Sequence, residues 1–168
     1  MAIVSSAAAG LRAASRATIL QLRAPTLSTA ALEHVATQLV AETAVPVLIS
    51  SRCDVALAAG ASGINLPESD ISVADARILV GGRLVGRSVH SVAGARQAER
   101  EGADFVIFGP VWESPSHPGT DAAGPTALAL VVKSVGIPVL AIGGVTEARV
   151  AEILASGAAG YAAIRLFE

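Results

Sequence analysis

The sequence predicts an α/β fold, a closed (β/α)8 barrel that forms one domain over residues 1–168. Short runs rich in Val, Ile and Leu alternate with alanine-rich segments of helical character along the whole chain. Runs such as VLAIGG (139–144) are apolar on both faces, as are strands of a parallel sheet that is covered on both sides. Repeated β–α units of this length favour a parallel sheet with right-handed crossovers.

The first half of the chain supplies four strands. ATILQLR (17–23) alternates as a strand does, and the segment 28–44 is a helix with Ser28 or Thr29 at its cap. AIVS (2–5) has the weakest pattern of the four. The remaining elements of this half are strands at 45–50 and 63–67, a short helix from Asp54, and a helical turn or two at 72–81.

The second half repeats the alternation. LVGRSVH (84–90) and ADFVIFGPV (103–111) are strands separated by a helix at 91–102, and Pro125 opens a helix over 125–135. The last elements are a strand at 137–144, a helix at 146–157 and a strand at 160–167. Eight strands close a barrel, whereas fewer or reordered strands would form an open doubly wound sheet. No GxGxxG follows any strand, which disfavours a dinucleotide-binding sheet.

Composition excludes several classes of function. The chain is 52% hydrophobic with a formal net charge of -2, so nothing favours binding to nucleic acid. A lone cysteine, Cys53, excludes an internal disulfide and a cysteine-based metal cluster. No apolar run reaches the roughly 18–20 residues that cross a bilayer, and the N-terminus is a poor signal peptide. A cytoplasmic protein without membrane contact is therefore expected.

Polar residues gather at the predicted strand ends, where such barrels place their active sites. Strand alternation puts Ser88 and His90 on one face and turns Arg87 toward the helices. A neutral histidine can accept and return a proton near pH 7, so His90 is a candidate acid–base group. The alternative is a strand-end residue that caps the helix beginning at Ser91.

A glycine pair suggests an anion site. Gly143 and Gly144 end the seventh strand, and Thr146 follows as a plausible cap of the next helix. Exposed backbone amides and the helix dipole would suit a phosphate group there. The alternative is a tight turn between strand and helix.

Together these pieces resemble the thiamin phosphate synthase/TenI superfamily from about Gln21 to Ile164. The segments that carry the resemblance are QLR, SRCDVALAAGASGINLPESD, GRSVHS, EGADFVIFGPVWES, IPVLAIGGV and ILASGAAGYAA. The resemblance implies a TIM barrel that binds a thiazole phosphate at the carboxyl ends of its strands. It implies His90 as the catalytic residue, Gln21, Arg23, Ser51, Ser88 and Gly109 as substrate contacts, and Gly143, Gly144, Ala163 and Ile164 as the phosphate site.

Two activities of the superfamily compete. A synthase of this superfamily couples a pyrimidine pyrophosphate to the thiazole phosphate with Mg²⁺. The resemblance places a lysine of the synthase motif at position 25, where this chain has Pro25. Ser50–Ser51 stands in place of Asn–Asp, which leaves Asp70 as the remaining acidic position. Without these groups the pyrophosphate loses stabilisation. We therefore predict the TenI-like activity, a thiazole tautomerase and hence an isomerase, with His90 as the acid–base group and neither metal nor cofactor.

The alternatives are a thiamin phosphate synthase, and a non-catalytic homologue that binds thiazole phosphate. The first βα unit is shorter than is usual in the superfamily, and no helix follows the eighth strand. An apolar barrel wall left uncovered favours self-association, so we expect a homodimer. Of the other histidines, His34 is expected on a helix surface, and His117 either covers the site as a lid or is simply exposed.

Overall fold

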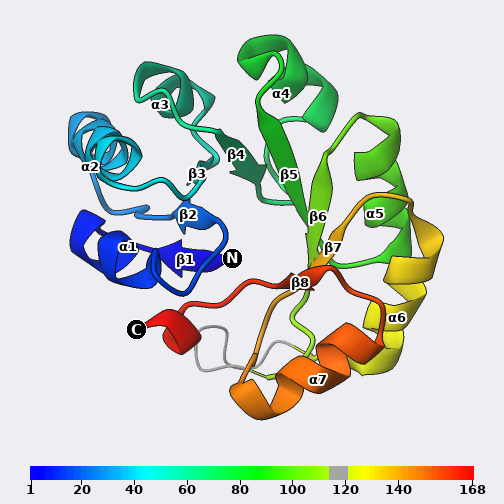
Figure 1. Ribbon diagram of the computed structural model, residues 1–168. Helices are drawn as coiled ribbons and strands as arrows, with labels where there is room; N and C mark the ends of the chain where they lie inside the picture. Colours follow the sequence, from blue (N-terminus) through cyan, green and yellow to red (C-terminus); the bar gives the residue numbers. More distant parts are fainter. Residues whose placement is uncertain (114–120) are drawn as a thin grey trace.

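Eight parallel strands form one sheet in the order in which they occur along the chain. The computed structural model describes residues 1–113 and 121–168 and is drawn in Figure 1. The strands are β1 (Ala2–Val4), β2 (Leu20–Leu22), β3 (Val47–Ser50), β4 (Gly63–Leu66), β5 (Leu84–Val89), β6 (Phe105–Phe108), β7 (Val139–Ala141) and β8 (Gly160–Tyr161). All seven neighbouring pairs are parallel, which confirms the fold class predicted from the sequence.

The sheet closes on itself. Ala2 forms a parallel bridge with Ala163, and the Ile3 amide donates to the Ala163 carbonyl at 2.9 Å. The paired residues can be followed around the sheet, from Ala2 on β1 to its partner on β2 and so on to β8, where they lead to position 155. The residue that actually pairs with Ala2 is Ala163, so the strands are staggered by eight residues around the barrel. A stagger of eight residues across eight strands is the geometry of closed (β/α)8 barrels.

Helices surround the ring of strands (Figure 1). Within the described residues they are α1 (Ala7–Ala13), α2 (Thr29–Glu42), α3 (Cys53–Ala58), α4 (Val73–Val80), α5 (Val92–Arg100), α6 (Gly124–Ser134) and α7 (Glu147–Ala155). Ser6, Ser28, Ser72 and Ser91 each accept the backbone amide three residues ahead. These serine caps fix where four of the helices begin. No helix in the described part of the chain is long and apolar enough to cross a membrane.

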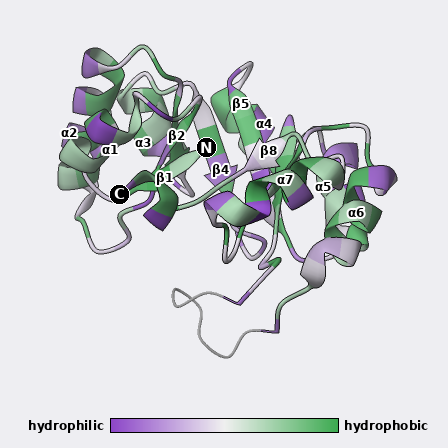
Figure 2. Ribbon diagram, turned by 60° about the horizontal axis from the view of Figure 1, so that its bottom comes forward, coloured by the Kyte–Doolittle hydropathy of each residue, from purple (hydrophilic) through white to green (hydrophobic). Residues whose placement is uncertain are grey.

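Two apolar clusters hold the fold together. The larger lies between strands and helices and is built mostly from Ala, Val, Leu and Ile, with Phe108 among its largest fully buried side chains. The smaller lies inside the barrel and contains Met1, Ile3, Leu48, Phe105, Ile107 and Ala162. Figure 2 shows hydrophobic and hydrophilic residues alternating along the helices, as expected for elements that bury one face.

The last strand differs from the sequence prediction of 160–167. β8 covers Gly160–Tyr161, Ala163 adds the bridge to β1, and a 3-10 helix, η1 (Arg165–Phe167), follows. The Phe167 side chain is buried and stacks on Tyr161 with ring centroids 6.2 Å apart. Burial of this aromatic side chain turns the chain back onto the barrel instead of extending the strand.

Replacing Gly63 is expected to destabilise the barrel. A Cβ at Gly63 would lie 2.1 Å from the Leu84 carbonyl oxygen, so β4 and β5 would have to separate. We expect Gly63→Ala to lower the free energy of unfolding by roughly 2 kcal/mol, a typical cost of overpacking, in urea denaturation. Gly82→Ala is the control, because nothing lies within 4 Å of the added methyl group. Equal stability of the two variants would contradict the prediction.

Candidate active site at the barrel mouth

One half of the barrel interior is polar where it approaches the carboxyl ends of the strands. The stagger of eight places inward side chains in levels of four that come from alternate strands. The two levels nearest the carboxyl ends are Gln21, Asn65, Ile107 and Ala162, and above them Ile3, Ser50, Ser88 and Ile142; Ala162 and Ile142 directly follow β8 and β7. The polar members all come from β2 to β5 and the apolar members from β6 to β8 and β1. A ligand at this mouth would therefore meet a polar wall opposite an apolar one.

The polar wall contains two buried side-chain carbonyl oxygens that have no partner within residues 1–113 and 121–168. Gln21 and Asn65 are 3% and 2% exposed, and the Asn65 Nδ2 group donates to the Ser88 Oγ atom at 3.1 Å. Gln21 Oε1 and Asn65 Oδ1 accept no hydrogen bond from any described residue. A buried polar atom without a partner is costly, so both oxygens are suited to accept N–H groups of a ligand.

His90 stands at the rim of the barrel, two residues beyond Ser88. Its ring Nδ1 atom is hydrogen-bonded to the Gly109 carbonyl oxygen, and its side chain is 58% exposed. The Nε2 atom lies 3.8 Å from the Glu68 Oε2 atom. The Ser91 side chain caps α5, so His90 is not the helix cap. If Nδ1 carries the proton donated to Gly109, Nε2 has a lone pair on the side of the ring near Glu68.

Two of the expected substrate contacts have backbone roles. Ser51 has a left-handed backbone, with φ of 66°, and its amide donates to the Asn65 carbonyl at 3.0 Å. The level arrangement turns Ser50, and not Ser51, toward the barrel interior. At Gly109 a Cβ would lie 2.2 Å from the Ile142 carbonyl oxygen, so a side chain there would push β6 away from the end of β7.

The glycine turn after β7 presents amides that are free of hydrogen bonds to the described part of the chain. The N–H groups of Gly143, Gly144, Val145 and Thr146 donate to no described residue. Gly143 and Gly144 have φ of 95° and 63°, a conformation that favours glycine. The β7–β8 register sets Gly143 level with Ala163, so the amide run lies beside the Ala163–Ile164 segment. This is the arrangement expected of an anion site at a helix N-terminus.

A cation supports this turn. The Arg149 Nη1 group donates to the Gly144 carbonyl oxygen at 2.5 Å, and the guanidinium lies over the Trp112 ring, 4.9 Å from its centroid. Glu147 places a negative charge in the first turn of α7.

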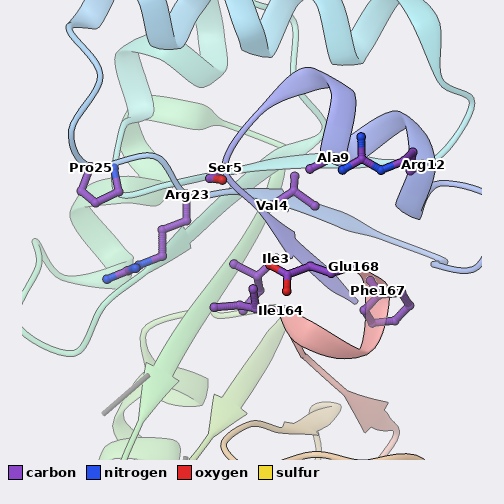
Figure 3. A pocket seen from close by; sticks show the side chains of 10 residues that line it. All are labelled: Ile3, Val4, Ser5, Ala9, Arg12, Arg23, Pro25, Ile164, Phe167 and Glu168. Atoms are coloured by element: carbon purple, nitrogen blue, oxygen red, sulfur yellow. The ribbon is translucent and has the colours of Figure 1, made fainter. Parts of the chain in front are cut away.

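A cavity of about 290 Å³ opens beside the ends of β1, β2 and β8. In Figure 3 Arg23 and Pro25 lie on one side of it, Arg12 and Phe167 on the other, and Ile3 lies between them. The Arg23 side chain makes no hydrogen bond to any other described residue and is largely exposed, whereas its backbone amide is held by the Val4 carbonyl at 2.8 Å. The cavity also includes Ile164, so Arg23 and the expected phosphate segment meet at one opening.

The carboxylates of the mouth come from the loop between β4 and α4. Asp70 uses its Oδ1 atom to accept the Ile71 amide at 2.8 Å. Its charge reaches the start of α3, because the pKa of Cys53 is raised first by burial and then by Asp70. The described residues contain no group of three His, Cys, Asp or Glu side chains that would hold a metal ion. The Asp70 Oδ2 atom accepts no hydrogen bond from a described residue. A Mg²⁺ ion commonly binds through one or two carboxylates plus phosphates, so Asp70 fits a Mg²⁺ ion that arrives with a phosphorylated ligand.

Other expected residues lie away from the mouth or outside the described chain. His34 is exposed on α2, as expected. Asp54 lies in the first turn of α3, and its carboxylate pairs with Arg52 at 2.5 Å; this hydrogen bond lowers the pKa of Asp54. His117 falls outside the described residues.

The sequence reasoning assigned no role to three residues of this region, although it placed Asn65 among the polar residues at the strand ends. Asn65 was recognisable as a polar residue at an inward position of the apolar run GINL. Glu68 and Arg149 occupy a loop and a helix surface, where charged residues are usually solvated. Only the fold brings Glu68 to His90 and Arg149 to Gly144.

Comparison with known proteins identifies the family. The chain matches the family described as thiamine monophosphate synthase over residues 2–167. A putative thiamine-phosphate synthase of Geobacter sulfurreducens is 49% identical over 119 residues, which cover 70% of this chain and 56% of that protein. The thiamine-phosphate synthase of Chloroflexus aurantiacus is 40% identical over 123 residues, covering 71% and 56%. The matched region thus spans little more than half the length of these curated relatives.

A solved structure agrees with them. Thiamine phosphate pyrophosphorylase from Pyrococcus furiosus superimposes with a TM-score of 0.87 at 28% identity, covering 97% of this chain and 84% of that one. The resemblance to the superfamily is thereby confirmed.

The prediction of a thiazole tautomerase, and with it of an isomerase, is wrong. Relatives between 37% and 49% identical carry the name thiamine-phosphate synthase, with the word putative in one case. The similar structure from Pyrococcus furiosus is named thiamine phosphate pyrophosphorylase. The prediction gave too much weight to the missing lysine and carboxylate, although a free amide run and Arg149 offer other charge stabilisation. Both the match over residues 2–167 and the barrel itself lead to one conclusion: the chain belongs to the thiamine monophosphate synthase family.

Proposed function

We propose that this chain is a thiamine-phosphate synthase, a transferase that joins a pyrimidine pyrophosphate to a thiazole phosphate. The observation that carries the proposal is the run of amides from Gly143 to Thr146 at the barrel mouth, which donate to no described residue, in a chain of this family. The reaction moves the pyrimidine group from pyrophosphate to the thiazole. Negative charge leaves with the pyrophosphate, so the site must bind two phosphorylated groups and stabilise the departing one.

The thiazole phosphate is assigned to the turn after β7. Gly143 and Gly144 would donate backbone amides to the phosphate oxygens, and Ala163 and Ile164 would border them. Arg149 adds a positive charge within the same turn. This assignment is supported by the free amides and by the level placement of Gly143 and Ala163.

The pyrimidine is assigned to the polar wall. The orphaned oxygen of Gln21 would accept a ring amino group, and Ser88 lies one level closer to the opening. Ser51 and Gly109 then keep backbone roles beside the ligand. Ile107 and Ile142 on the opposite wall provide an apolar surface for an aromatic ring.

The pyrophosphate is assigned to Arg23 and Asp70. Arg23 would pair with pyrophosphate oxygens, and Asp70 would be the protein carboxylate on the accompanying Mg²⁺. When bound, Mg²⁺ neutralises part of the charge that develops on the leaving group. No carbon-bound proton has to be removed in this transfer, so His90 is assigned a binding role at the rim.

The test is formation of thiamin phosphate from the two substrates by the purified chain. We expect product that depends on Mg²⁺, and Asp70→Asn should raise the Mg²⁺ concentration needed for half-maximal rate by about tenfold, as for the loss of one charged ligand among several. Asp75→Asn is the control, because Asp75 caps its own helix with Ser72. Absence of product with both substrates at saturation would reject the proposal.

A second candidate is a homologue that binds thiazole phosphate without catalysis. Ser50–Ser51 favours it, because neither residue offers a carboxylate to a metal ion. It predicts that thiazole phosphate binds in calorimetry while no product forms.

The homodimer and the cytoplasmic location expected from the sequence remain predictions. Exposed apolar side chains on α3 and α4 support self-association: Leu57 is 41% exposed, Ile78 81% and Leu79 55%.

A further inference from the structure

Arg87 holds the loop that carries both carboxylates of the barrel mouth. It lies on β5 between Gly86 and Ser88, and its side chain leaves the barrel interior. The Nη1 group donates to the Ile71 carbonyl at 2.6 Å, and Nη2 donates to the Glu68 carbonyl at 2.7 Å and to the Asp70 carbonyl at 3.5 Å. One guanidinium thus binds three carbonyl groups within four consecutive residues.

A second attachment fixes the same loop from the side of α5. The Glu68 Oε1 atom accepts the His90 backbone amide at 3.4 Å. A Cβ at Gly94 would lie 2.9 Å from that oxygen, so the absence of a side chain there makes room for the carboxylate. A carboxylate at a helix N-terminus is electrostatically favourable. Glu68 is therefore used for anchoring, and Asp70 is the carboxylate left for a ligand.

Among the described residues, the Asp70 carboxylate makes one hydrogen bond that could orient it. Its Oδ1 atom accepts the amide of the next residue, a local contact that moves with the loop. The loop conformation, and hence the direction of the Asp70 carboxylate, depends on the three carbonyl groups held by Arg87.

We propose that Arg87 is a positioning residue that sets the Asp70 carboxylate for the pyrophosphate and its Mg²⁺. The inference rests on the proposed function. A planar guanidinium can donate in two directions at once, whereas a lysine offers a compact point charge. Arg87 consequently acts on the substrate only through the loop.

The experiment measures substrate saturation separately for the two substrates. We expect Arg87→Met to raise KM for the pyrimidine pyrophosphate about tenfold and to change KM for the thiazole phosphate less than twofold. Arg87→Lys should recover part of the loss. In the Arg87→Met, Asp70→Asn double variant the two effects should not add, because both act through one carboxylate.

A binding measurement makes the test independent of turnover. We expect inorganic pyrophosphate with Mg²⁺ to bind the wild-type chain in calorimetry and to bind Arg87→Met about tenfold more weakly. Arg83→Met is the matched control: Arg83 precedes the same strand and donates to the Ala61 carbonyl at 3.1 Å, toward the opposite end of the barrel. It should change stability without changing either binding or KM.

The outcomes separate the two proposals. If the wild-type chain makes no product but Arg87→Met still weakens binding of Mg²⁺ and pyrophosphate, the synthase proposal fails and the positioning role survives. If Arg87→Met and Arg83→Met lower the melting temperature equally and neither changes binding, the positioning role is overturned. Additive effects in the double variant would also overturn it. If Arg87→Met fails to fold, Arg87→Lys replaces it in the test, and unchanged binding of Mg²⁺ and pyrophosphate by Arg87→Lys would overturn the positioning role.

Discussion

Arg23→Met is expected to lower kcat/KM for thiamin phosphate formation by roughly 10²–10³-fold, the range seen when one charge-stabilising donor is removed. Arg23 follows β2 and lines the cavity that also contains Ile164. Its guanidinium is bound to no other described residue, so it is available to the pyrophosphate. Because negative charge on the pyrophosphate grows during transfer, the loss should appear mainly in kcat.

Two variants sharpen this test. Arg23→Lys keeps the charge and loses the paired donors, so we expect an intermediate rate. Arg16→Met, on the exposed segment after α1, removes an equal charge from the surface and should leave the rate unchanged. Wild-type kinetics of Arg23→Met would show that Arg23 does not bind the pyrophosphate. A change confined to KM for the thiazole phosphate would instead move it to the other substrate.

The fold was predictable because local and global signals agree. Alanine-rich segments that follow a serine form helices capped by that serine, as at Ser28 and Ser91. Runs that are apolar on both faces form buried strands. The C-terminal strand was predicted too long because GYAAIRLF is apolar apart from Arg165. Nothing in that run indicates that Phe167 would stack on Tyr161.

The candidate site was predictable in part. Residues at strand ends, such as Ser88 and Gly143, lie where the periodicity placed them. Contacts between loops are set by tertiary packing, so Glu68 beside His90 had no local signal. The activity was misjudged because it was inferred from residues that were absent. A missing carboxylate does not identify a reaction when other groups can carry the charge.

Gly144→Ala is expected to weaken binding of thiazole phosphate by about 100-fold, which corresponds to losing one or two hydrogen bonds to a charged group. With φ of 63°, the residue is left-handed, and an added Cβ would lie 2.6 Å from the Glu113 carbonyl oxygen and 2.7 Å from the Trp112 Cβ atom. The turn must move, and the free amides from Gly143 to Thr146 move with it.

Gly81 separates backbone strain from loss of the phosphate site. Its φ of 61° is nearly the same as that of Gly144, but nothing lies within 4 Å of a Cβ added there. Both alanine variants should lose stability, because a positive φ is unfavourable for a residue with a Cβ atom. In calorimetry Gly81→Ala should bind thiazole phosphate as the wild type does, whereas Gly144→Ala should not. If the two variants bound it equally well, the phosphate would have to lie elsewhere than at the start of α7.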